Sequence, residues 1–434
     1  MERPASASIE IPRARSTGGV HPWAVRMSWV LLALLMLLLC LPLGITAFTA
    51  ALSELPEQRG AQGPLSFVAG TFRGVKRVLE EEPPGRQALK EVYDRVRIET
   101  LKSSPNPKVV VGSDEWLFFL EPDSGLPTYV HDRPLAPEDL AQWQRVIEQR
   151  VKFFAQRGVT YLLVMAPSKS SVQGPAHLPT RIQPRSARGR FDQIVEGLSP
   201  AARAHVLDLR STLREQAQHT DNYYRLDSHW NDAGAYLAYG KMVGRIAELA
   251  DAEGRPLPMD WARPVAVNRT RVPAERNDLA AMLNHPRFMT EWTTALTPKD
   301  PAPARFLVPM DSLSTLRDPR VPADSNFHPY GRRVETADAQ QLPRCVAFRD
   351  SFFHIMEPFF AHHCQRLILL KHLDKLETPA LSLDMKVLAA ERPQVVVEEF
   401  VERLLNRSYA LPPRSLSEQD GEQFGAPVES HSLR

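Results

Sequence analysis

The chain has 434 residues, of which 43% are apolar and 24% are charged, a composition typical of folded proteins with a sizeable core. Its 53 Lys and Arg nearly balance its 51 Asp and Glu, which argues against broad electrostatic binding of nucleic acid. The three cysteines are too few for a disulfide-rich scaffold or for a zinc site made of several cysteines.

An apolar segment without any charged residue runs from residue 27 to residue 53. About 20 apolar residues cross the hydrocarbon core of a bilayer as a helix, so we expect a transmembrane signal-anchor helix over residues 27–51. The arginines of residues 1–26 outnumber the glutamates there, and the positive-inside rule therefore predicts a cytoplasmic tail and export of the rest of the chain. A cleaved signal peptide, with a processing site at residues 49–51, is the alternative.

Helical patterns over residues 52–105 predict a helical stalk, and short apolar strands alternate with helices from there onward. This alternation predicts an α/β sandwich with a mainly parallel sheet over residues 106–405. Residues 252–340 interrupt the alternation and are rich in Pro, Arg and Asp, which favours an insertion with little regular structure. The polar residues 406–434 are predicted to be a disordered tail. The predicted strands are 161–166, 204–210, 345–350, 366–371 and 394–400, and the predicted helices are 136–157, 233–250, 352–363 and 381–392.

Ser351 is placed at the end of a predicted strand, directly before a predicted helix. Ligands of open parallel sheets bind beyond the carboxyl ends of the strands, so the hydroxyl of Ser351 would face such a site. Its backbone N–H would lie at a helix N-terminus, where partial positive charge favours an oxyanion. These features suit a nucleophile, although an ordinary helix N-cap would explain this segment taken by itself.

Asp227 and His229 form a second candidate pair. An imidazole titrates near neutral pH and can remove the proton of an alcohol. An acidic residue two positions earlier can turn back to hold the Nδ1–H group and leave Nε2 free for a serine. The alternative is an Asp that caps the next helix and a His that packs against Trp230.

The two segments resemble those of the AlgJ/AlgX-type polysaccharide O-acetyltransferases, whose catalytic domain is SGNH-hydrolase-like. The family signature D-x-H-W-[ST/N]-x-x-G-A is similar to residues 227–235, and its D-S-F segment is similar to residues 350–352. An early V-x-G-x-x-G-W-L-F segment is similar to residues 110–118, with Glu115 at the usual Gly. Further similarities at residues 167–169, 278–283 and 402–403 extend the resemblance, in order, from about residue 90 to about residue 405.

This resemblance implies a triad of Ser351 as nucleophile, His229 as base and Asp227 as orienting acid. The implied protein is a membrane-anchored O-acetyltransferase that moves an acetyl group through a serine acyl-enzyme onto hydroxyls of an exopolysaccharide, as in alginate biosynthesis. It would have a polysaccharide acceptor, a membrane-bound O-acyltransferase partner as acetyl donor, a single-pass inner-membrane anchor and a periplasmic catalytic domain, with no cofactor and no metal. A carbohydrate esterase with the same triad and a non-catalytic subunit of a polysaccharide export complex are the alternatives.

Arg349 and Lys169 are candidates for contacts with the substrate. Arg349 stands where SGNH enzymes often have Gly, and its guanidinium would either be exposed or meet a uronate carboxylate. Lys169 would either contact substrate at a strand end or be a solvated charge. Asp350 is predicted to orient the turn rather than to join the triad.

Cys345 and Cys364 are predicted to form a disulfide. The strand that begins at Cys345 and the helix that follows Ser351 have nearly equal lengths, which would bring Cys364 back to the level of Cys345. Export would place both thiols in an oxidising compartment. Two buried free thiols are the alternative.

Overall fold

The computed structural model describes Ile98 and most of the chain from residue 103 onward. The predicted anchor helix over residues 27–51, the cytoplasmic tail before it and nearly all of the predicted stalk lie outside the described residues. None of the helices in the described part combines the length and the apolar character needed to cross a bilayer. The described ranges are 103–120, 128–131, 133–283, 291–300, 305–308, 331–336, 340–371, 382–406, 415–417, 421–422 and 424.

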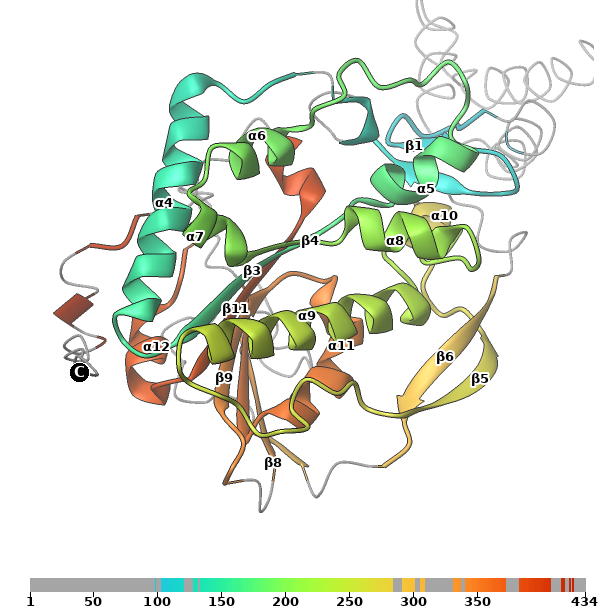
Figure 1. Ribbon diagram of the computed structural model, residues 1–434. Helices are drawn as coiled ribbons and strands as arrows, with labels where there is room; N and C mark the ends of the chain where they lie inside the picture. The colour runs from blue at the N-terminus through green and yellow to red at the C-terminus, as the bar shows by residue number, and fades with distance from the viewer. Residues whose placement is uncertain are drawn as a thin grey trace, which may run out of the picture. The chain divides into compact units, whose positions relative to one another are not determined.

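A sheet of seven described strands forms the centre of the domain (Figure 1). Five neighbouring strands of this sheet are parallel to one another, and two further strands add antiparallel pairs at one edge. All residues of β3 and β11 are buried, as expected for strands covered on both faces. The predicted α/β fold with a mainly parallel sheet is therefore confirmed. The strand order is β4 (Val206–Asp208), β3 (Thr160–Ala166), β11 (Val395–Val401), β9 (Arg344–Arg349), β10 (Arg366–Lys371), β8 (Gly331–Thr336) and β7 (Arg305–Val308).

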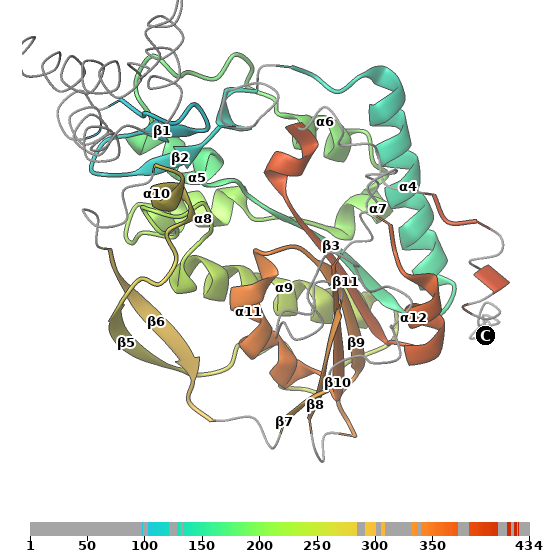
Figure 2. The same ribbon diagram turned by 180° about the vertical axis from the view of Figure 1, so that it is seen from behind.

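Helices cover both faces of this sheet (Figures 1 and 2). Successive side chains of a strand point to opposite faces, so Leu162 and Val164 of β3 pack in one core while Tyr161 and Leu163 pack in the other. The first core includes α8 (Arg210–Ala217), α9 (Asp232–Ala252) and α11 (Phe353–Phe360), and the second includes α4 (Pro137–Ala155), α6 (Arg190–Glu196), α7 (Pro200–Ala204) and α12 (Met385–Glu391). Other elements include the strands β1 (Val109–Val111) and β2 (Leu117–Phe119), helix α5 (Lys169–His177), and the 3-10 turns η2 (Thr128–Val130), η4 (Ala361–His363) and η5 (Glu402–Asn406).

The prediction of an insertion with little regular structure is wrong for much of residues 252–340. Strands β5 (Val267–Pro273) and β6 (Trp292–Pro298) pair along their whole length as an antiparallel ribbon, with helix α10 (Asp278–Met282) between them in sequence. Strands β7 and β8 join the central sheet. The sequence did not indicate the ribbon because it buries little: Leu296 is the one residue of its two strands that is buried. Without an apolar face, a strand lacks the alternating signal that predicts it.

Part of the predicted disordered tail is ordered against helix α4. The backbone N–H of Leu416 donates to the side-chain oxygen of Gln149 at 2.9 Å, and the amide of Gln149 donates back to the Leu416 carbonyl at 2.7 Å. The ring of Phe424 meets the ring of Phe153 edge-on, with centroids 5.6 Å apart. For these residues the prediction of disorder is wrong, because a few apolar side chains of the tail find an open part of the second core.

Cys345 and Cys364 form a disulfide with their Cα atoms 5.9 Å apart, and the prediction of this bond is confirmed. Both cysteines are buried in the core between the sheet and α9. The bond joins the start of β9 to the end of η4, so it closes the strand–turn–helix unit that carries Ser351.

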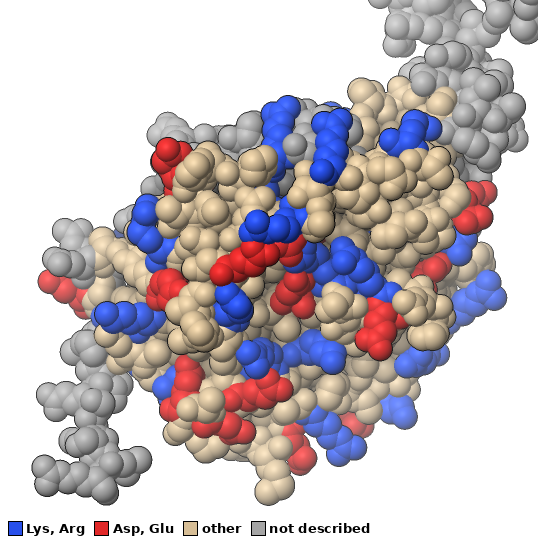
Figure 3. All heavy atoms as spheres, turned by 45° about the horizontal axis from the view of Figure 1, so that its top comes forward, with Lys and Arg blue, Asp and Glu red and all other residues tan. Residues whose placement is uncertain are grey.

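The charged side chains show no separation by sign on the face drawn in Figure 3, where Lys and Arg are interspersed with Asp and Glu. This pattern agrees with the near-balance of charges in the sequence. A broad basic surface, which nucleic-acid binding would need, is not seen on that face.

Candidate active site

The structure brings Asp227, His229 and Ser351 together. The Nε2 atom of His229 lies 2.8 Å from the Oγ atom of Ser351. On the other side of the ring, Nδ1 lies 2.7 Å from the Oδ1 atom of Asp227. With the ring proton on Nδ1, this arrangement lets Nε2 accept the proton of the serine hydroxyl. Asp227 and His229 are buried, whereas Ser351 is exposed at the surface of the site.

A tight turn between β9 and α11 presents Ser351. The residue that caps α11 is Phe352, so Ser351 is not the helix N-cap, and its hydroxyl is engaged with His229 instead. The carboxylate of Asp350 accepts the backbone N–H groups of Phe352 and Val401, both at 2.8 Å. Asp350 therefore orients the turn and fastens it to the end of β11, as predicted.

The loop that carries Asp227 and His229 is held at both ends. Asn231 caps helix α9 by accepting the N–H of Gly234 at 3.1 Å, and its amide donates to the carbonyl of Asp221 at 2.7 Å. A Cβ atom at Gly234 would lie 2.2 Å from the carbonyl oxygen of Asn222. Only glycine permits that approach, which explains why the signature around the base has Gly at this position.

Trp230 connects the base segment to the nucleophile segment. Its Nε1–H donates to the carbonyl of Phe352, the residue after Ser351, at 2.9 Å. The ring of Phe352 also lies against the imidazole of His229, with centroids 4.7 Å apart. The Trp of the D-x-H-W signature thus fixes the separation between the two segments.

The early segment over residues 110–118 contains a strained backbone position. Glu115, which stands at the usual Gly of the early segment, has a φ of 64°. An L-residue other than Gly pays about 1 kcal/mol or more for this left-handed conformation. The structure thereby explains the usual Gly at this position.

Asp278 is a second carboxylate beside the triad that the sequence did not identify. Its backbone N–H donates to Asp227 Oδ2 at 2.9 Å, and its carboxylate accepts the N–H and the hydroxyl of Ser228 at 2.7 and 2.6 Å. The sequence showed residues 278–283 as part of a motif but indicated no role for them. Asp278 thus forms hydrogen bonds to Asp227 and Ser228, the two residues before His229, and holds the conformation of this loop.

The pKa values of Asp227 and Asp278 are shifted in opposite directions. Burial by itself would raise the pKa of Asp227, but the hydrogen bond and charge of His229, together with backbone N–H groups, hold that pKa well below its usual range. Burial and the charge of Asp227 raise the pKa of Asp278. Asp227 is therefore the ionised acid that orients the imidazole.

Potential ligand atoms of Asp227, His229 and Asp278 lie within 4.8 Å of one another, a spacing that a metal ion could use. In this arrangement the Nδ1 atom of His229 is hydrogen-bonded to Asp227, and the carboxylate of Asp278 is hydrogen-bonded to Ser228. The same atoms thus serve the triad and its support.

Lys169 is not a solvated charge, and that prediction is wrong, whereas its contact with substrate stays a prediction. Its side chain is buried, and its Nζ atom donates to the carbonyls of Arg225 and Asp227 at 2.7 and 3.0 Å. The ammonium also lies 5.0 Å from the centroid of the Trp116 ring. Burial lowers the pKa of Lys169 to about 7 in spite of nearby carboxylates. Its position supports the loop that carries Asp227.

Arg349 is half-buried at the end of β9, and its Nη1 atom lies 3.4 Å from the carbonyl oxygen of Asp350. Burial raises the pKa of the nearby Glu399 carboxyl, and the positive charge of Arg349 opposes this shift in part. Arg349 thus lies beside the support of the nucleophile turn, and its contact with a substrate carboxylate remains a prediction.

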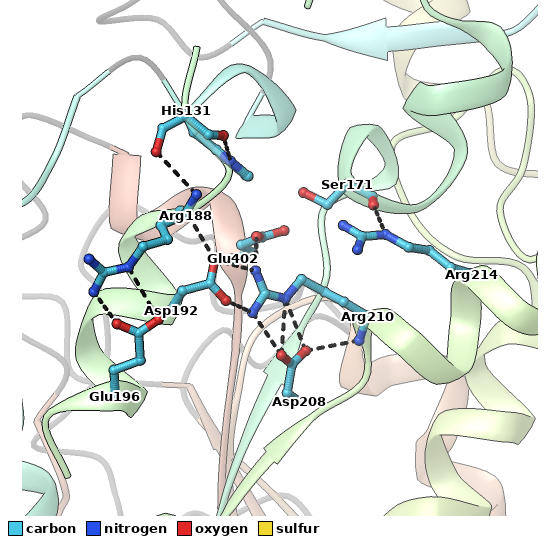
Figure 4. Close-up of polar contacts among 11 residues, drawn as sticks. His131, Ser171, Arg188, Asp192, Glu196, Asp208, Arg210, Arg214 and Glu402 are labelled. Carbon is cyan, nitrogen blue, oxygen red and sulfur yellow. Dashed lines mark hydrogen bonds and ion pairs between the residues drawn. The ribbon is translucent and has the colours of Figure 1, made fainter. Parts of the chain in front are cut away.

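A buried guanidinium locks the sheet edge next to the site (Figure 4). Arg210, at the start of α8, forms ion pairs with Asp192 of α6 and Asp208 of β4 and lies 3.8 Å from Glu402. Glu402 in turn accepts the backbone N–H of Ser168 at 3.0 Å. The ends of three neighbouring strands are joined in this way.

Arg403, the residue after Glu402, lies close to the triad. Its guanidinium carbon is 5.3 Å from the centroid of the Phe352 ring, which also contacts His229. The sequence showed Arg403 as part of a motif without indicating a place in the site. A small pocket is lined by Arg403 together with Phe119, Ser168, Lys169, Ser170 and Ser228.

Comparison with known proteins supports a family assignment for the domain. Residues 109–319 match a family described as the SGNH hydrolase-like domain of acetyltransferase AlgX. A curated relative, the "Probable alginate O-acetylase AlgJ" of Pseudomonas syringae pv. tomato, is 27% identical over 150 residues. That match covers 35% of this chain, and the chain spans only about a third (36%) of the length of the relative.

Solved structures with a similar arrangement include Bacillus cereus PatB1 and the O-acetyltransferase domain of Pseudomonas putida AlgJ. The PatB1 structure has a TM-score of 0.47 and 17% identity, and it covers 70% of this chain and 100% of its own. The AlgJ domain has a TM-score of 0.39 and 17% identity, and it covers 73% of this chain and 98% of its own.

The family match includes Asp227 and His229 but ends before Ser351, so the position of the serine comes from the geometry of the turn. The sequence signature, the mainly parallel sheet and the matched region agree with one another. Residues 109–319 are therefore similar to the SGNH hydrolase-like domain of acetyltransferase AlgX, and part of the chain is similar to an AlgJ relative.

Proposed function

We propose that this protein is a polysaccharide O-acetyltransferase that works through an acyl-enzyme on Ser351. The observation that carries the proposal is the 2.8 Å separation of His229 Nε2 and Ser351 Oγ, with Asp227 bonded to the other ring nitrogen. A serine, an imidazole and a carboxylate in this order can transfer acyl groups without a cofactor.

In the first half-reaction the Oγ atom of Ser351 attacks the carbonyl carbon of the acyl donor, and His229 takes the hydroxyl proton. The tetrahedral oxyanion that forms needs hydrogen-bond donors. The backbone N–H of Ser351 suits this task, since among the described residues no acceptor is found for it. The C–O bond to the donor then breaks, and His229 gives its proton to the leaving oxygen.

In the second half-reaction a sugar hydroxyl attacks the acyl-Ser351. His229 takes the proton of that hydroxyl, and the ester bond to Ser351 breaks, which returns the serine to its starting state. The name of the curated relative supports an acceptor of the alginate type. The donor would be a membrane-bound O-acyltransferase, and an inner-membrane anchor over residues 27–51 would hold the catalytic domain in the periplasm.

A carbohydrate esterase is the second candidate, because Ser351 is exposed and water could reach its acyl form. The two activities differ only in the group that accepts the acetyl. A non-catalytic subunit of an export complex would retain the fold without any need for Ser351.

The test uses the purified full-length protein and 4-nitrophenyl acetate. We expect the peptide that contains Ser351 to gain the mass of one acetyl group, and we expect Ser351→Ala and His229→Ala to abolish this gain. Addition of a polymannuronate acceptor should then move the acetyl to the polymer, as followed by NMR. Release of free acetate at an unchanged rate would favour the esterase, and a wild-type protein that never becomes acetylated would overturn the enzyme proposal.

A further inference from the structure

A second concave surface lies between the β5–β6 ribbon and the loop that leads to Asp227. This cleft has a volume of about 440 Å³. One side is formed by Arg271 of β5 and by Trp292 and Thr294 of β6, and the other side includes Asp221 and Arg225. The cleft is distinct from the small pocket beside Arg403, whose lining shares no residue with it.

Trp292 is the unusual residue of this cleft. Its exposed fraction is 56%, and the other large hydrophobic side chains that are exposed in the described part of the chain are the flexible Met259 and Met282. A Trp ring left in water forgoes the burial that its large apolar face favours, unless a ligand covers it. The flat ring suits the C–H face of a sugar ring, which is also flat and partly apolar.

The polar lining suits the edges of a sugar. Thr294 lies opposite Arg271 in the register of the ribbon, and Trp292 is two residues from Thr294 on the same strand, so the three side chains share one face. Thr220 also lines the cleft, and its hydroxyl and that of Thr294 can bind sugar hydroxyls. A concave surface with one aromatic platform and a few polar groups is typical of small-ligand sites.

The lining contains the carboxylates of Glu115, Asp221 and Glu291 and the guanidinium groups of Arg225 and Arg271, and Arg271 is the group that can meet an acidic sugar. The guanidinium carbon of Arg271 lies 5.6 Å from the centroid of the Trp292 ring. Of the three carboxylates in the lining, Asp221 is paired with Arg225 at 3.1 Å. Glu291 accepts the backbone N–H groups of Arg225 and Leu226 at 2.7 and 3.1 Å. Arg271 has no carboxylate partner among the described residues, so its charge can meet a carboxylate of a ligand.

The cleft and the triad share one loop. Leu226, which lines the cleft, directly precedes Asp227, and Asn231 follows His229 by two residues. The carbonyl of Arg225 accepts both the N–H of Leu117 and the Nζ of Lys169, so this wall of the cleft is held firmly. A chain bound in the cleft would therefore lie against the segment that positions the base.

We propose that this cleft is a subsite for the acceptor polysaccharide, in which Trp292 stacks on a sugar ring and Arg271 binds the carboxylate of an acidic sugar. The inference rests on the proposed function, since it assigns a place to the acceptor of that reaction. The two proposals can be tested separately, because acylation of Ser351 does not require a ligand in the cleft.

The test compares Trp292→Ala, Trp292→Phe and Arg271→Ala with wild type in the full-length protein. Arg269→Ala is the matched control, because Arg269 is an exposed arginine on the same strand that does not line the cleft. The probes are an oligomannuronate and a cello-oligosaccharide of equal length, and binding is measured by calorimetry. Acylation of Ser351 by 4-nitrophenyl acetate is measured in parallel.

We expect Trp292→Ala to weaken binding of the oligomannuronate about tenfold, which corresponds to about 1.4 kcal/mol. Trp292→Phe should restore part of the affinity, and Arg271→Ala should weaken the acidic oligomer more than the neutral one. Acylation should be unchanged in all four variants. Equal binding by wild type and Trp292→Ala would overturn the subsite, and equal losses for both oligomers in Arg271→Ala would overturn the role of the carboxylate.

The failures of the two proposals can be told apart. If wild type never becomes acetylated while Trp292→Ala still weakens binding, the proposed reaction fails and the binding site stands. If acylation proceeds and no variant of the cleft alters binding, the subsite fails and the reaction stands.

Discussion

The carboxyl group of Glu399 accepts the backbone N–H of Asp350 at 3.0 Å, one residue before Ser351. Glu399 is fully buried on β11, next to the carboxylate of Asp350. Burial and the charge of Asp350 raise the pKa of Glu399 well above its ordinary value. Glu399 is therefore protonated over a wider pH range than an ordinary glutamic acid, because burial disfavours its charged form.

The first prediction concerns the pH dependence of stability. A carboxyl whose folded-state pKa is raised stabilises the fold below its unfolded pKa of 4.5, and this contribution is lost as the pH rises through the folded pKa. Glu399→Gln keeps a neutral side chain and should remove that loss. We therefore expect the free energy of unfolding of wild type to fall with rising pH relative to Glu399→Gln, as measured by urea denaturation at several pH values. Parallel pH profiles would contradict the protonated state of Glu399.

The neighbouring Glu398 provides the contrast for this experiment. Glu398 is buried and paired with Arg150, and it also accepts the hydroxyl of Tyr161 at 2.6 Å. Glu398→Gln should cost about 3 kcal/mol or more at neutral pH, because it leaves the charge of Arg150 buried without a partner. The same substitution at adjacent positions should thus have different effects.

The second prediction tests the link between base and nucleophile. Trp230→Phe removes the hydrogen bond to the Phe352 carbonyl and should lower the rate of Ser351 acylation about tenfold or more. Trp261→Phe is the matched control, because Trp261 is also buried and donates to a backbone carbonyl, that of His363, at 2.7 Å. Each variant should lose about 1–3 kcal/mol of stability for an unsatisfied carbonyl. Equal acylation rates in the two variants would show that Trp230 serves stability alone.

The third prediction concerns the disulfide. The double variant Cys345→Ala/Cys364→Ala opens a loop with a sequence separation of 19, and the chain-entropy model gives a loss of about 3 kcal/mol in the free energy of unfolding. Cys40→Ala is the control and should not change this value when the same transition is measured. An unchanged midpoint in the double variant, or two titratable thiols at these positions in the native protein, would contradict the role assigned to the bond.

The fourth prediction concerns Lys169. Burial lowers its folded-state pKa from 10.5 to about 7, so the unfolded chain binds more protons between these values and wild-type stability should rise with pH across that range. Lys169→Met should lack this rise. It should also slow acylation of Ser351, because the carbonyls of Arg225 and Asp227 lose their donor. Lys108→Met, at an exposed position, is the control, and an identical pH profile in wild type and Lys169→Met would contradict the burial of the charge.

The sequence by itself determined the parts of this protein that depend on local spacing. Alternating apolar strands and helices predicted the strands β3, β4, β9, β10 and β11 and the helices α9, α11 and α12, because their periods are written in consecutive residues. The resemblance of residues 227–235 and 350–352 to two family segments implied which side chains would meet. The disulfide between Cys345 and Cys364 followed from the lengths of one strand and one helix.

Only the tertiary structure decided which polar groups lose contact with water. Lys169 is buried because Trp116 and the carbonyls of a distant loop surround it, and no pattern near residue 169 contains that information. Asp278 accepts the backbone N–H of Ser228 although the two residues are 50 positions apart in the sequence. The β5–β6 ribbon likewise depends on pairing between two polar strands, and it places Trp292 at the rim of a cleft. Such environments arise from packing between distant segments, whose energies exceed the local preferences that a sequence pattern records.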